Sequence, residues 1–174
     1  MPNWERGHEP VEHFRSEAER LAAERGAESP TDPRMSWDFE VDDAGLVWVV
    51  LDPRFPGFAE AVSDSIGSLS PAGSEAKLST YWIDRTLTWL VANEDSSEAV
   101  QLSSGNMSAL ERQGSIVRAV ALYETFEPEE LSADEVIGGL LAWRRTVLDR
   151  ISIHGDSVPI NEAGGVVGMR RPPH

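Results

Sequence analysis

Two histidines and two glutamates near the N-terminus are the residue types most suited to metal chemistry. Residues 8–13 read His-Glu-Pro-Val-Glu-His. Zinc-protease motifs on helices place their histidines four positions apart, because residues at i and i+4 share one helix face. His8 and His13 lie five positions apart, with Pro10 between them. We therefore predict no metal site here.

A second group of reactive residue types lies near the C-terminus, where His154, Asp156 and Ser157 are the types found in a hydrolase triad. In such a triad the base and the nucleophile converge from separate elements, which neighbours on one loop cannot do. His154 is therefore expected to be an ordinary loop histidine. The chain also lacks the Gly-x-Ser-x-Gly, P-loop and dinucleotide-binding motifs. We predict no catalytic residues, no cofactor and no enzymatic activity.

The most suggestive charged group is the acidic segment, residues 124–135, which contains no Lys or Arg. Carboxylates interspersed with apolar anchors suit the capture of a basic protein surface. The candidate partner surface consists of Glu124, Phe126, Glu127, Glu129, Glu130 and Asp134. The alternative is a solvated loop whose charges only favour the start of the helix that follows.

A third candidate is Arg144, which falls in the middle of an apolar helical stripe. An unpaired charge there would be costly to desolvate, so we expect a largely buried guanidinium bonded to a carboxylate or to backbone carbonyls. Arg144 is then either a snorkelling or internally paired residue, or part of a site. A pocket of the second kind would be assembled from dispersed residues, with Tyr123, Trp82 and His154 as the other candidates.

The helix that positions Arg144 is predicted to begin near Ala133 and to reach Ile151. Ser132 and Glu135 form a capping-box pattern at its start. The apolar residues that recur at steps of three and four are Val136, Leu140, Trp143, Val147 and Ile151. The opposite face carries the small residues Gly138, Gly139, Ala142 and Thr146. Such a face is expected to be covered by another helix of the chain or by a second protomer in a homodimer, and simple exposure is the alternative.

The remaining periodicities predict an α+β fold. Helical patterns occur at 10–26, 58–69 and 78–91, the last with a competing strand pattern. Strand patterns occur at 36–41, 46–51, 100–102, 107–112 and 115–123, and Val158 and Ile160 could add a short strand. We expect one domain at 1–160, with helices packed on a mainly antiparallel sheet of four to six strands, and a tail at 161–174.

Charge restricts the classes of partner. Thirty acidic against fifteen basic residues give a formal net charge of −15, which repels nucleic-acid phosphates and anionic lipid headgroups. The chain has no basic-then-apolar signal pattern and no apolar run of about 18 residues, so no membrane span is expected. The absence of cysteine fits the reducing cytoplasm.

These properties favour one class of function over another. A small acidic domain without catalytic motifs is similar, in composition alone, to toxin-neutralising immunity proteins and secretion chaperones. We therefore expect a non-enzymatic module that holds or inhibits a basic partner protein. The alternative is a small-molecule-binding protein or enzyme whose site surrounds Arg144.

Overall fold

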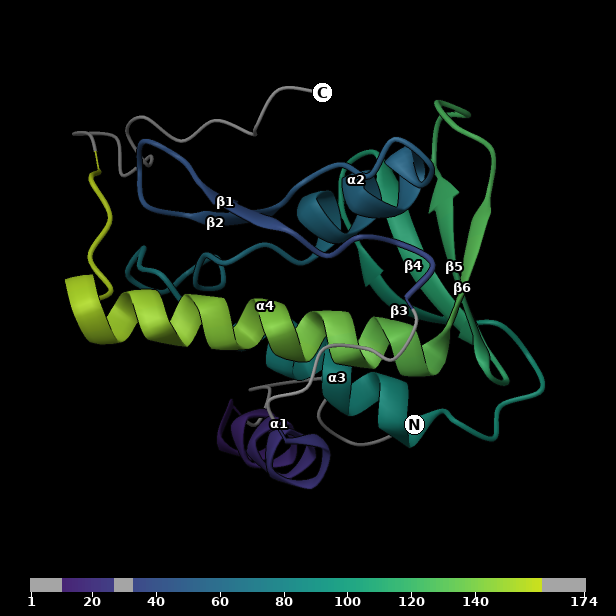
Figure 1. Cartoon of the computed structure of the whole chain (residues 1–174), viewed down its shortest axis with the longest axis horizontal. Helices are drawn as coiled ribbons and strands as arrows, with labels where there is room; N and C mark the ends of the chain where they lie inside the picture. The colour runs from purple at the N-terminus through teal and green to yellow at the C-terminus, as the bar shows by residue number, and fades with distance from the viewer. Residues whose placement is uncertain (1–10, 27–32, 161–174) are drawn as a thin grey trace.

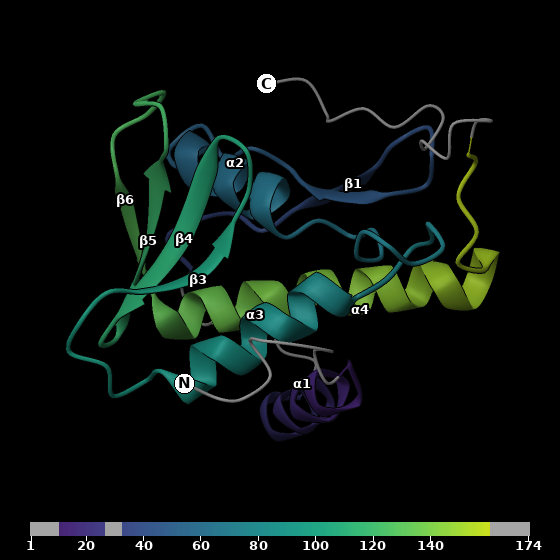
Figure 2. The ribbon, with the colours of Figure 1, turned by 180° about the vertical axis from the view of Figure 1, so that it is seen from behind.

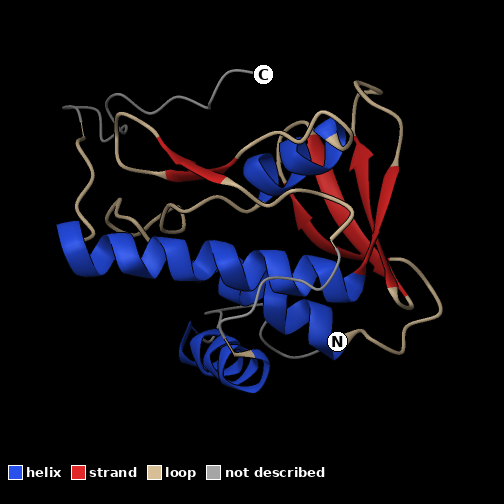
Figure 3. Ribbon diagram, in the orientation of Figure 1, coloured by secondary structure: helices blue, strands red, loops and turns tan. Residues whose placement is uncertain are grey.

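The structure, a computed structural model, describes residues 11–26 and 33–160. In these ranges four helices and two antiparallel sheets form an α+β fold, as the sequence predicts (Figures 1 and 3). His8 and the predicted tail at 161–174 lie outside the described residues. Within the described part, no helix is both long and apolar enough to cross a bilayer.

Each element expected between residues 11 and 154 is present, although several ends are shifted. The helices are α1 (Val11–Arg25), α2 (Pro56–Ser65), α3 (Tyr81–Ala92) and α4 (Ala133–His154). The strands are β1 (Phe39–Val41), β2 (Val47–Val49), β3 (Val100–Ser104), β4 (Ser108–Gln113), β5 (Ile116–Ala121) and β6 (Glu129–Ser132). The ambiguous segment 78–91 is helical, and α3 buries a wide apolar face because α1 and α4 both pack against it.

The larger sheet contains β3, β4, β5 and β6 in that order, each antiparallel to its neighbour. β5 lies inside this sheet, as its apolar residues predict. Helix α2 packs on β4 and β5 (Figure 2). The β1–β2 hairpin forms a separate two-stranded sheet, and the Asp42 carboxylate closes its turn by accepting from the backbone N–H groups of Ala44 and Leu46, both at 2.9 Å.

Helix α4 runs through the middle of the fold. Helices α1 and α3 pack on one side of it, and the β1–β2 hairpin lies on the other (Figures 1 and 2). Trp143 is fully buried, and its indole Nε1 donates to the carbonyl of Val47 at 3.0 Å. This contact fixes the hairpin against the helix.

The start of α4 forms half of the predicted capping box. Ser132 Oγ accepts from the backbone N–H of Glu135 at 3.2 Å. The second bond of a capping box, from the backbone N–H of Ser132 to the Glu135 carboxylate, is not formed. The Glu135 carboxylate accepts instead from the backbone N–H of Arg34, a residue about one hundred positions earlier, so the carboxylate ties the segment before β1 to the helix start.

The small-residue face of α4 is covered within the chain at its two glycines. Gly138 and Gly139 are buried, and a Cβ on Gly139 would lie 2.2 Å from ring atoms of Trp37. Ala142 and Thr146 are half-buried, and the Thr146 hydroxyl donates to the Ala142 carbonyl at 2.9 Å. An indole ring, rather than a second helix or protomer, therefore accounts for the absence of a side chain at Gly139.

Two local expectations differ from the structure. The acidic segment was expected as a loop, but Glu129–Ser132 form β6, because Leu131 is buried and the backbone pairs with β5 from Ala119 to Ile116. Val158 and Ile160 do not form the predicted strand, because the segment pairs only at isolated bridges. Ser157 bridges to Lys77, and Ile160 also lies in an isolated bridge, whereas Val158 is in none.

Candidate functional site

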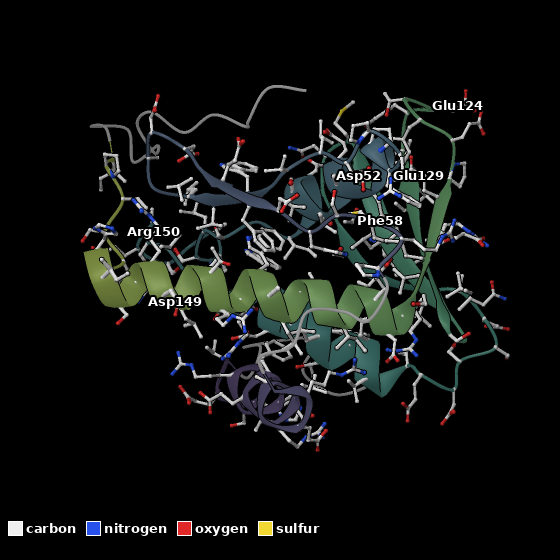
Figure 4. The ribbon with its side chains drawn as sticks, in the orientation of Figure 1. Asp52, Phe58, Glu124, Glu129, Asp149 and Arg150 are labelled. Carbon is white, nitrogen blue, oxygen red and sulfur yellow. The ribbon has the colours of Figure 1, made fainter. Side chains whose placement is uncertain are left out.

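The acidic segment is divided between carboxylates that the fold uses and carboxylates that it leaves free. Glu129 accepts from the backbone N–H groups of Gly57 at 3.1 Å and Phe58 at 2.6 Å, at the N-terminus of α2 (Figure 4). Such a position favours negative charge, because the first N–H groups of a helix have no partner within it. Glu129 is therefore a structural residue.

Two further acids of the segment form ion pairs. Glu130 pairs with Arg118 on the neighbouring strand, at 2.6 Å between Oε1 and Nη2. Asp134 pairs with Arg25 at the end of α1, at 2.7 Å. Both pairs are solvent-exposed, so each contributes at most about 1 kcal/mol to stability. They reduce the charge that these acids offer to a partner.

The loop between β5 and β6 contains the remaining candidates. Phe126 is half-buried because it lies over Gly57, where a Cβ would approach its ring to 2.3 Å. Glu124 and Glu127 are exposed and make no ion pair or hydrogen bond with another described residue. Glu124 has a left-handed backbone with φ of 54°, which is uncommon for a residue other than glycine.

Large apolar side chains are exposed beside these free acids. Met107, Leu122 and Tyr123 have exposed fractions of 39%, 47% and 69%. The backbone N–H of Leu122 donates to the carbonyl of Met107 at 2.8 Å, so residues from the β3–β4 and β5–β6 loops lie side by side. We name Met107, Leu122, Tyr123, Glu124 and Glu127 the sheet-tip surface, which lies at the end of the larger sheet where Figure 4 labels Glu124.

Arg144 is buried and paired, as predicted. Its Nε donates to Asp84 Oδ1 at 2.8 Å, and the two residues have exposed fractions of 7% and 3%. The hydroxyl of Thr80 donates to the other oxygen of Asp84 at 2.9 Å. Burial raises the pKa of the Asp84 carboxyl, and the charge and hydrogen bond of Arg144 oppose that rise.

Arg144 also lines two grooves. One, of about 340 Å³, lies among α1, the start of α3 and α4, and is lined by Arg15, Glu19, Lys77, Leu78, Ser79, Thr80, Arg144, Leu148, Ile151 and Asp156. The other, of about 420 Å³, lies between α1 and α4 and is lined by Ala22, Ala23, Gly26, Leu141, Ala142, Arg144, Arg145, Leu148 and Asp149. These grooves are termed the Arg144 grooves below.

The other predicted pocket residues do not line the grooves that contain Arg144. Tyr123 belongs to the sheet-tip surface, and His154 is exposed at the far end of α4. Trp82 packs edge-on against Tyr81, with ring centroids 4.9 Å apart, and lines neither groove. The dispersed residues therefore form no common site.

Sequence reasoning missed Asp84, Lys77 and Met107. The signal that identified Arg144 could have found Asp84, because it too is a charged residue within an apolar helical segment. Lys77 is the single lysine of the chain, yet nothing in its local sequence indicates a groove. Met107 follows a turn, and its exposure depends on how that turn folds over Asp64, whose carboxylate accepts from the Met107 N–H at 2.9 Å.

No three His, Asp or Glu side chains of the described residues gather as the ligands of a metal ion would. Comparison of the chain with known proteins gives no match to a family model, to a curated protein or to a solved structure.

Proposed function

We propose that the protein is a non-enzymatic binding module of the cytoplasm that holds or inhibits a basic partner protein, as an immunity protein or a chaperone does. The observation that carries the proposal is the sheet-tip surface, where Met107, Leu122 and Tyr123 are exposed together with the carboxylates of Glu124 and Glu127, which pair with no other described residue. Tyrosine and methionine are enriched at protein interfaces, where they supply buried contact area.

The charge of this surface indicates which partner it would accept. Free carboxylates at the rim of an apolar patch attract a cationic surface and repel an anionic one. The net charge of −15 extends that attraction beyond contact distance, over a screening length of about 8 Å at physiological salt. In this arrangement the apolar side chains govern how long a partner stays, and the acids govern how fast it arrives.

The proposal is tested by surface plasmon resonance with the full chain and a synthetic amphipathic peptide of lysine and leucine. Replacing Glu124 and Glu127 with Gln should lower the association rate several-fold at low salt and weaken its salt dependence. Replacing Leu122 and Tyr123 with Ser should mainly raise the dissociation rate, by about tenfold.

A charge-matched control separates this surface from the overall field. Glu94 and Glu98 are exposed acids in the α3–β3 loop, and changing both to Gln removes the same two charges elsewhere. This variant should associate almost as fast as the parent. An equal loss of association rate in the two double variants would overturn the assignment, because the peptide would then respond only to net charge.

A further inference from the structure

We propose that the Arg144 grooves bind a small amphipathic monocarboxylate, with its carboxylate on Arg144 and its apolar part along Leu148. This site is separate from the sheet-tip surface, since it lies between α4 and α1, away from the larger sheet (Figures 1 and 2). The inference does not depend on the proposed function.

The first support is the hydrogen bonding of Arg144. Nε is held by Asp84 at 2.8 Å, which fixes the plane of the guanidinium. Neither Nη1 nor Nη2 hydrogen-bonds to a described residue, although the whole residue is 7% exposed. A guanidinium presents its donors in a rigid fork, and the outer Nη1–Nη2 edge matches the two oxygens of a carboxylate. Because Arg144 lines both grooves, the proposal places these remaining donors there.

The second support is the charge of the surroundings. The grooves are lined by four basic residues, Arg15, Lys77, Arg144 and Arg145, and by three acidic ones, Glu19, Asp149 and Asp156. Asp84 beneath them offsets one further positive charge. The region is thus near neutral in a chain whose net charge is −15, so it repels anions far less than the rest of the surface does. A near-neutral groove in an acidic protein favours a carboxylate with one negative charge over a phosphate with two, because repulsion by the surrounding acids grows with the charge of the ligand.

The third support is the apolar lining. Leu148 lines both grooves and is 38% exposed, and Ile151 lies one turn further along α4 in the smaller groove. An apolar chain or ring placed here would remove these side chains from water. The volumes of 340 and 420 Å³ fall at the lower end of the range of about 300–1,000 Å³ for ligand pockets.

The test is isothermal titration calorimetry of the full chain with octanoate, and with octanamide as its uncharged counterpart. Octanoate should bind saturably, and octanamide at least about tenfold more weakly, because the amide lacks the charge-assisted pair of hydrogen bonds. Inorganic phosphate should not compete. Absence of saturable octanoate binding, equal binding of the amide, or displacement by phosphate would each overturn the proposal.

Variants on the surface of α4 locate the binding without disturbing the buried ion pair. Leu148→Glu places a carboxylate in both grooves and should weaken octanoate binding by about tenfold or more. Ile153→Glu is the matched control, because Ile153 is an exposed apolar residue on the same helix and lines neither groove. Equal octanoate affinity in the two variants would contradict the location.

Discussion

Arg144 and Asp84 each carry a charge that would be costly to bury alone, and the fold gives each the other as its partner. Removing one member of a buried pair leaves the second charge uncompensated and typically costs about 3–5 kcal/mol. Replacing both members by apolar residues of similar volume is often neutral. The pair therefore contributes little net stability, although neither residue tolerates substitution alone.

Arg144→Met should lower the free energy of unfolding by about 3–5 kcal/mol, and Asp84→Leu combined with Arg144→Met should lower it much less. Denaturant unfolding of the two single variants and the double variant measures this coupling. If the losses of the single variants simply add, the two charges are not energetically linked.

The same variant should respond to pH. Burial raises the pKa of Asp84, and loss of Arg144 would raise it further. A carboxyl whose folded-state pKa exceeds its unfolded value contributes stability at low pH, and this contribution is lost as the pH rises through the folded-state pKa. The stability deficit of Arg144→Met relative to the parent should therefore shrink as the pH falls from about 7 towards about 4. A constant deficit would contradict this account.

Among the secondary-structure elements, α2 obtains its N-terminal cap from another element. Pro56 begins the helix, and the preceding Phe55 makes no side-chain capping bond. The carboxylate of Glu129 on β6 occupies this position instead, with two hydrogen bonds to the first turn. Strand β6 is thereby attached to α2 as well as to β5.

Glu129→Gln should lower the free energy of unfolding by about 0.5–2 kcal/mol, because the amide keeps one acceptor and loses the charge at the helix N-terminus. Glu130→Gln is the control, since Glu130 neighbours it on β6 but forms an exposed pair with Arg118, worth less than about 1 kcal/mol. Urea unfolding compares the two. Equal losses in the free energy of unfolding would show that the Glu129 cap contributes no more stability than the exposed pair of Glu130.

At the scale of the whole molecule, the chain has thirty acidic and fifteen basic residues. The repulsion among the excess negative charges destabilises the compact folded state. The ion pairs among the described residues are mostly exposed and offset only part of this repulsion. Salt screens interactions between exposed charges, so it should stabilise this protein.

Raising sodium chloride from about 0.05 M to about 0.5 M should raise the Tm by about 2–4 °C, equivalent to about 1 kcal/mol. Thermal unfolding followed by circular dichroism measures this shift. The variant with Gln at positions 94 and 98 should show a smaller rise. A Tm that falls with salt would indicate that attractive pairs outweigh the repulsion.

The sequence by itself determined the elements and the faces they bury. Helical phase placed Arg144 inside an apolar stripe, and the structure buries it; the Ser132 cap and the small-residue face of α4 were also visible from local spacing. These features depend on neighbours within a few residues, so periodicity and capping patterns encode them directly.

Only the tertiary structure decided which partners these residues meet. Arg144 and Asp84 are 60 positions apart, and Glu129 and Gly57 are 72 apart. Gly139 meets Trp37 from a different segment. No local pattern specifies such distant contacts. The acidic segment could therefore be recognised as charged, but not divided into the carboxylate that caps α2, the Glu135 carboxylate that accepts from Arg34, two exposed ion pairs and two acids that pair with no other described residue. The sheet-tip surface and the Arg144 grooves exist for the same reason, because each combines residues that become neighbours only when the helices and strands pack.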